Sequence, residues 1–170
     1  MIDEDTDYLT EAHVAPLRDL IALYDPALLP KRVKSAFFYL EYVAWTYYID
    51  MRWPMLVTAA EALVHVSNEM DPRDSRRYAG STRVFIDRMM GIQDVLGPLG
   101  FTEPELRAIY QERSGLAHGQ DFSGIGPDER RRYRMLEEGM RAIFRSAIED
   151  APFRALFDTD AALQQAFPLR

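Results

Sequence analysis

Arg113 is the residue whose type and position most clearly suggest chemistry. It lies on the apolar side of a predicted helix, seven positions after Leu106 and four after Ile109, a spacing that places all three on one helical face. Burying a guanidinium without a partner is costly. We therefore expect Arg113 to bind a carboxylate, a phosphate or water held in a pocket.

An earlier predicted helix offers an acidic partner. Glu61 is the one acid in the apolar stretch from Leu56 to Val66, and His65 follows it by about one helical turn. Two alternatives fit this pattern. Arg113 and Glu61 form a buried ion pair that fixes how two helices pack, or Glu61 and His65 support a reactive site around Arg113. A histidine in such a place is more often a buried structural residue than a catalyst.

His118 adds a proton-transfer group five residues after Arg113. Gly119 follows it, and glycine is the preferred residue just beyond a helix end. The imidazole is therefore expected at or after the last helical turn, from which it can turn back towards Arg113. A histidine titrates near neutral pH, as a residue that exchanges protons with a substrate must.

The elements that position these residues are predicted to be helices. Apolar residues recur at intervals of three and four, and no alternating strand pattern is convincing. The predicted fold class is all-α: an up-and-down bundle of about five to seven helices in a single domain, residues 1–170. The predicted helices cover approximately residues 8–24, 31–49, 52–70, 81–97, 102–118 and 127–148, with one or two short helices after them.

Several local signals refine this pattern. Pro16 is expected to interrupt the first helix, and residues 70–80 are predicted to form a charged loop. Thr102 and Glu105 have the spacing of a capping box at the start of the fifth helix. The second helix is apolar on more than one side, so we expect it at the centre of the bundle or at a subunit interface. Its aromatic residues are Phe37, Phe38, Tyr39, Tyr42, Trp45, Tyr47 and Tyr48.

The composition excludes several classes of site. The 170 residues include no cysteine, which rules out a disulfide scaffold, a thiol nucleophile and a cysteine-bound metal. The three histidines are more than fifty residues apart and match no metal motif of the HExxH type. We therefore expect no metal and no other cofactor.

Charge and hydropathy narrow the partners. A net charge of −7 argues against non-specific coating of duplex nucleic acid. The basic run Arg130–Arg134 is interleaved with acids and is predicted to be a solvated helix face rather than an RNA path. No apolar run approaches the roughly 18 residues that span a bilayer, and the acidic start of the chain is unlike a signal peptide. We expect a cytoplasmic protein without membrane contact.

The run from Tyr110 to Gly119, Tyr-Gln-Glu-Arg-Ser-Gly-Leu-Ala-His-Gly, resembles the R-x4-H signature of HEPN domains, in the form found in Apea-like members. Residues 52–63 are similar to the family's apolar helix with its glutamate, and residues 81–88 to the helix that follows. The resemblance covers residues 52–120. At Gln120 a subset of the family has a tyrosine instead.

The resemblance implies a helical bundle, usually dimeric, that cleaves RNA without a metal. Arg113 and His118 carry over onto the two motif positions, and Ser114 onto the variable polar position after the arginine. In-line cleavage needs a base, an acid and positive charge on the phosphorane. A two-fold homodimer with its fifth helices facing each other would bring two histidines and two arginines into one cleft.

Two functions are therefore expected as alternatives. The first is a HEPN-type metal-independent endoribonuclease, a defence or stress effector with RNA as substrate, in which Arg113 and His118 are catalytic and Glu61, His65 and Ser114 support them. The second is a non-catalytic HEPN-like binding or assembly module that docks to a partner through the aromatic helix or the motif cleft. A protein partner or inhibitor fits either function.

Overall fold

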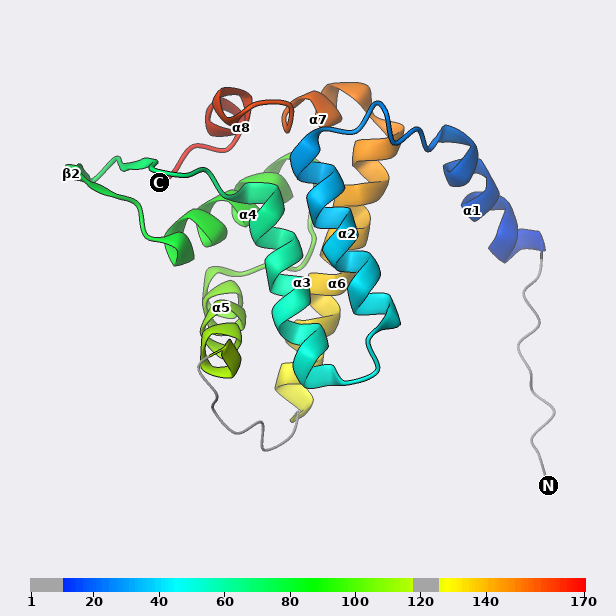
Figure 1. Ribbon diagram of the computed structural model, residues 1–170, viewed down its shortest axis with the longest axis horizontal. Coiled ribbons are helices and arrows are strands. Elements are labelled where there is room, and N and C mark those ends of the chain that lie inside the picture. Colours follow the sequence, from blue (N-terminus) through cyan, green and yellow to red (C-terminus); the bar gives the residue numbers. More distant parts are fainter. Residues whose placement is uncertain (1–10, 118–125) are drawn as a thin grey trace.

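The computed structural model describes residues 11–117 and 126–170, which form a helical bundle with one small hairpin. This confirms the predicted all-α class (Figure 1). The elements are α1 (Glu11–Leu23), α2 (Lys31–Trp45), α3 (Ile49–Val64), β1 (Met70–Asp71), β2 (Asp74–Tyr78), α4 (Ser81–Leu96), α5 (Glu103–Ala117), α6 (Pro127–Glu149), α7 (Ala151–Ala155) and α8 (Asp160–Ala166).

The central helix of the bundle is α3. It packs against α2, α4, α5 and α6, and Figure 1 shows α2, α3 and α6 running side by side. A helix with neighbours on several sides must be apolar around most of its circumference. Its buried residues are Trp53, Leu56, Val57, Ala59, Ala60, Leu63 and Val64. Glu61 therefore belongs to the best-anchored helix of the fold.

Two helices end earlier than predicted. α2 stops at Trp45 rather than near Ile49, and α3 stops at Val64 rather than near Met70. At the end of α2 the Thr46 N–H and hydroxyl both donate to the carbonyl of Tyr42, at 2.9 and 2.7 Å, and the backbone of Thr46 is extended. His65, the residue after α3, is extended in the same way.

α1 projects away from the rest of the bundle in Figure 1. It runs from Glu11 to Leu23 without a break at Pro16, so the expected interruption is wrong. A proline costs a helix one backbone hydrogen bond, and α1 continues despite that loss. The predicted start near Tyr8 lies outside the described residues.

Residues 70–80 form a hairpin rather than the predicted loop. β1 and β2 pair antiparallel, with Asp71 opposite Asp74. The Asp71 carboxylate accepts a hydrogen bond from the N–H of Arg73 at 2.8 Å, and the Asp74 carboxylate accepts one from the N–H of Arg76 at 3.1 Å. Such side-chain turns reverse the chain locally. The strands are too short and too polar to show the alternation by which strands are recognised.

Arg88 on α4 is a fully buried charged residue that sequence reasoning did not single out. Its guanidinium donates to the two carboxylate oxygens of Glu69 at 2.6 and 2.5 Å, and to the carbonyl of Val64 at 2.6 Å. A longer bond of 3.4 Å reaches the carbonyl of Phe167. Burial lowers the pKa of Arg88, and the charge of Glu69 opposes that shift. The pair ties the end of α3 to α4 and to the segment after α8.

Candidate functional site

The start of α5 is fixed as the sequence predicts. The N–H of Glu105 donates to the Thr102 hydroxyl at 3.4 Å, and that hydroxyl donates to the Glu105 carboxylate at 3.0 Å. Arg131 of α6 donates to the other carboxylate oxygen. Hydrogen bonds from Arg131 and Thr102 hold the pKa of Glu105 below its usual value. The cap and the ion pair hold the start of α5, the helix that carries Arg113.

Arg113 is received by a carboxylate, one of the three partners expected for it. Its Nη2 donates to Oε2 of Glu61 at 3.0 Å, which joins α5 to α3. The side chains are 30% and 21% exposed, so the pair is half-buried and still reached by solvent. The expectation that Arg113 and Glu61 meet is confirmed.

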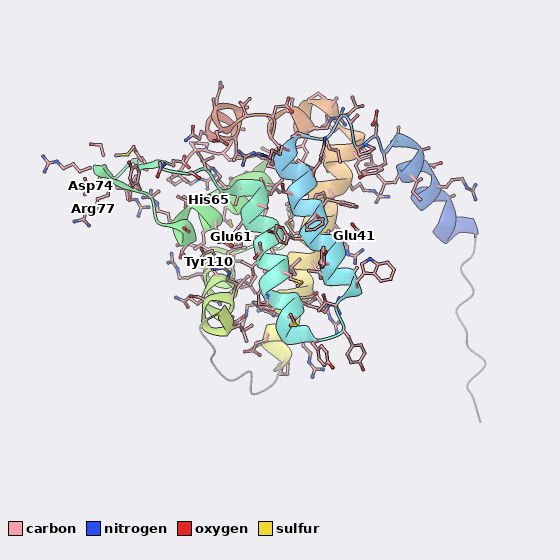
Figure 2. The ribbon with its side chains drawn as sticks, in the orientation of Figure 1. Glu41, Glu61, His65, Asp74, Arg77 and Tyr110 are labelled. Carbon is pink, nitrogen blue, oxygen red and sulfur yellow. The ribbon has the colours of Figure 1, made fainter. Side chains whose placement is uncertain are left out.

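Tyr110 completes the cluster, one helical turn before Arg113. Its hydroxyl donates to Oε1 of Glu61 at 2.8 Å, so both oxygens of that carboxylate are bound. Figure 2 labels Glu61 on α3 and Tyr110 on α5. Burial raises the pKa of Tyr110, and its bond to Glu61 raises it further. A hydrogen bond with Ser81, at the start of α4, acts in the opposite direction. Sequence reasoning placed Tyr110 on the buried face but assigned it no role.

The cluster presents a cation in a fixed direction near the end of α5. A guanidinium carries five N–H donors in a planar fork, and Glu61 contacts one nitrogen of Arg113. The carbon between those nitrogens lies 5.9 Å from the centre of the Tyr110 ring, which also restricts the side chain. A partly exposed arginine held in this way suits planar recognition of a phosphate. Such a ligand would bind through the N–H groups that Glu61 does not use.

The structure says less about the other two motif residues, His118 and Ser114. α5 is described as far as Ala117, so His118 lies outside the described residues and its position relative to Arg113 stays a prediction. Ser114 follows Arg113 on α5 and is half-buried. The structure therefore brings Arg113 to Glu61 and does not test the meeting of Arg113 with the imidazole.

His65 is not part of this cluster in the way the sequence suggested. α3 ends at Val64, and His65 has an extended backbone and an exposed side chain. The rule that residues four apart share a helical face does not hold beyond the helix end. His65 lines a separate depression with Arg32 and Asp160. The interpretation of His65 as a buried core histidine is wrong. It assumed that α3 continues past Val64, where the helix in fact ends.

A second polar cluster lies between α3, α5 and α6. Arg132 of α6 pairs with Glu112, the residue beside Arg113. Burial raises the pKa of Glu112, and Arg132 opposes that shift. Among the described residues, four buried side-chain atoms here have no hydrogen-bond partner: Arg52 Nε, Glu112 Oε2, Arg132 Nε and the Tyr133 hydroxyl. The sequence did not predict this cluster, because charged residues spaced in this way are usually exposed to solvent on a helix face.

The basic run on α6 is largely paired within the fold. Arg131 binds Glu105 and Arg132 binds Glu112, while Arg130 and Arg134 are exposed. The prediction was a solvated helix face, and the exposed Arg130 and Arg134 fit it. Arg131 and Arg132 are instead held by acids of α5, which reduces the positive potential that a nucleic-acid path requires.

Within residues 11–117 and 126–170, no group of three or more histidine or acidic side chains is arranged to hold a metal ion. Of the described helices, none is both long enough and apolar enough to cross a bilayer. Comparison of the chain with family models, with curated proteins and with solved structures found no match.

Proposed function

We propose that this chain is a HEPN-type endoribonuclease that cleaves RNA without a metal, with Arg113 and His118 as its catalytic residues. The observation that supports it is the cluster of Arg113, Glu61 and Tyr110. It holds a partly exposed cation on α5, and His118 is five residues further along the sequence. RNA cleavage by in-line attack requires a cation that stabilises the phosphorane and groups, such as an imidazole, that transfer protons.

The reaction is an in-line attack of the ribose 2′-oxygen on the adjacent phosphorus. A base takes the proton of the 2′-hydroxyl, the bond to the 5′-oxygen breaks, and an acid gives that oxygen a proton. Negative charge grows on the phosphorane oxygens, where Arg113 would act. One His118 can serve as base or as acid, so a homodimer with two motifs in one cleft would supply both.

Glu61 and Tyr110 act as positioning residues in this proposal. Glu61 fixes one nitrogen of the Arg113 guanidinium, and Tyr110 fixes the other oxygen of Glu61. A side chain that is already ordered loses less freedom when it binds a phosphate. Tyr110→Phe should therefore weaken cleavage less than a change of Arg113 itself, and through transition-state binding rather than proton transfer.

Cleavage of a mixed RNA pool in EDTA tests the proposal. Wild type should cut, and His118→Ala should lose about a hundredfold or more of the rate, the share that general acid–base catalysis supplies. Arg113→Lys should lose a similar factor, because lysine cannot bind a phosphate bidentately. Arg107→Lys is the matched control, since Arg107 is an exposed arginine of the same helix that pairs with Glu103.

The helical circular dichroism of each variant must match that of wild type. Loss of cleavage in His118→Ala and Arg113→Lys with retained helicity supports the proposal. A wild type that does not cut RNA, or a His118→Ala variant that cuts equally well, overturns it. In that case the Arg113–Glu61 pair is an internal tie between α3 and α5.

A non-catalytic assembly module is the second candidate, and one observation favours it. α2 exposes Phe38, Tyr42 and Trp45 to solvent, although large apolar patches of this kind usually mark interaction surfaces. Under this function the wild type leaves RNA intact and still associates with a protein through α2. The EDTA assay separates the two candidates, because an assembly role predicts no cleavage at any chain concentration.

A further inference from the structure

The hairpin of β1 and β2 projects from the helical bundle. Figure 1 shows β2 at the edge of the molecule, on the side opposite α1, and Figure 2 shows Asp74 and Arg77 at its outer end. Among the described strands, β1 and β2 pair only with each other. Every residue of β2 after Asp74 is exposed. The hairpin therefore offers its side chains to a partner without any rearrangement of the helices.

One face of the hairpin combines an aromatic ring with a cation. Side chains alternate between the two faces of a strand, so Arg76 and Tyr78 of β2 share a face. Met70 of β1 pairs with Tyr78 and lies on the same face. Tyr78 is 64% exposed and Met70 is 45% exposed. We define the hairpin face as Met70, Arg76 and Tyr78.

The acids near the hairpin face are already bound within the fold. Asp74, which shares that face, accepts a hydrogen bond from the N–H of Arg76 and forms an ion pair with Arg77 at 3.4 Å. The other two pairs are Asp71 with Arg83 and Glu69 with Arg88. The guanidinium of Arg76 has no ion-pair partner among the residues that the structure describes. The hairpin face therefore presents an uncompensated positive charge, although the whole chain carries −7.

A ring and a cation two residues apart on a strand match one unpaired nucleotide. The two residues are about 6.6 Å apart along the strand. An aromatic ring stacks on a base, and a guanidinium binds a phosphate. A base is available for such stacking where it is not paired in a duplex. An acidic peptide would use Arg76 and leave the ring of Tyr78 in water, so the hairpin face favours a single-stranded nucleic acid.

The hairpin leads directly to the Arg113 cluster. Tyr78 is three residues before Ser81, so their Cα atoms are at most about 11 Å apart. Ser81 begins α4 and forms a hydrogen bond with Tyr110. The Tyr110 hydroxyl binds Glu61, which also binds Arg113. A single strand held at the hairpin face therefore has a short path to Arg113.

We infer that the hairpin face binds single-stranded RNA, with one base stacked on Tyr78 and a neighbouring phosphate on Arg76. This surface deepens the proposed function and rests on it, since it gives the RNA substrate a second point of attachment. The attachment strengthens the binding of substrate and transition state equally, so it lowers KM and leaves kcat unchanged. Arg76 and Tyr78 position the RNA and take no part in bond making.

Binding of a 2′-O-methyl RNA tests the inference without cleavage. The methyl group blocks the 2′-oxygen whose attack the proposed reaction requires, so a short, unstructured, fluorescent strand stays intact. Fluorescence anisotropy then gives its Kd. Tyr78→Ala should weaken binding about fivefold or more, the effect of losing one stacked base. Tyr78→Phe keeps the ring and should bind within about twofold of wild type.

The salt dependence of Kd tests the role of the cation. Arg76→Gln should reduce the slope of log Kd against log salt concentration by about 0.7, the contribution of one phosphate of a single strand. Tyr78→Ala should leave that slope unchanged. The matched controls are Arg145→Gln and Tyr47→Ala, which remove exposed side chains outside the hairpin. Both controls should bind the probe as wild type does, and all variants should keep the circular dichroism of wild type.

The outcomes separate the hairpin face from the proposed ribonuclease. A wild type that binds the probe through Arg76 and Tyr78 but leaves ordinary RNA uncut supports the hairpin face and overturns the ribonuclease. In a chain that cuts RNA, Tyr78→Ala should raise KM and keep kcat. The hairpin face is overturned by a wild type that does not bind the probe, by hairpin variants that bind it equally well, or by an unchanged KM. It is also overturned if polyglutamate of equal charge displaces the probe as well as unlabelled RNA does.

Discussion

Replacing Glu69 with glutamine shows how strongly the fold depends on the buried charge of Arg88. Glutamine keeps the shape of the side chain but removes the only carboxylate that contacts the guanidinium in the described structure. Removing one partner of a buried ion pair costs about 3–5 kcal/mol. Glutamine still offers one oxygen, and the carbonyl of Val64 stays bound, so we expect the lower end, about 3 kcal/mol.

That loss is large against the total stability of a domain, about 5–15 kcal/mol. For a chain of this length each kcal/mol lowers the midpoint of thermal unfolding by about 2–4 °C. The midpoint of Glu69→Gln should therefore fall by about 6–12 °C. Circular dichroism during heating, together with urea unfolding, measures both quantities.

The matched control is Glu103→Gln. Glu103 pairs with Arg107, and both side chains are more than half exposed, so the expected loss is below about 1 kcal/mol. Adding Arg88→Met to Glu69→Gln should recover part of the loss, because the buried charge is then gone. If Glu69→Gln costs no more than Glu103→Gln, the argument that Arg88 is closed off from water is refuted.

Three further variants test the acids of α5 and the packing of α6. Glu105 has a lowered pKa, so its ionised form stabilises the fold above the usual value of 4.5 and that contribution is lost as the pH falls through the lower pKa of the folded state. Glu105→Gln should therefore lower the thermal midpoint at neutral pH, with a smaller difference in acid. Glu112 has a raised pKa because it is buried, so its ionisation costs stability as the pH rises. Glu112→Gln should raise the midpoint at neutral pH and lose that advantage below pH 4.5. Gly139→Ala would place a Cβ 2.3 Å from the Phe101 ring and should cost about 1–3 kcal/mol in urea unfolding, whereas Gly80→Ala, with open space around it, should cost little.

The helical fold could be predicted because its signal is repeated along the chain. α4, α5 and α6 follow the predicted ranges closely, since apolar spacing and capping residues agree there. The errors lie at the ends of α2 and α3, where the backbone becomes extended at Thr46 and His65 although apolar residues follow in the sequence. A sequence pattern averaged over several turns does not locate such a boundary.

The candidate site could be predicted where burial demands a partner. A guanidinium on an apolar face needs a counter-charge, and this led to the contact of Arg113 with Glu61 that the structure shows. Tyr110 was harder to find, because a tyrosine among apolar residues looks like ordinary core until its hydroxyl is placed. Arg88 was not singled out, because its partner, Glu69, is 19 residues away in the sequence and lies outside the helices.

The single motif arginine that α5 supplies has a consequence for reaction order. Cleavage that needs two histidines in one cleft would require two chains to meet. Its initial velocity would climb faster than linearly as chain concentration increases, whereas cutting by a lone motif would scale in simple proportion.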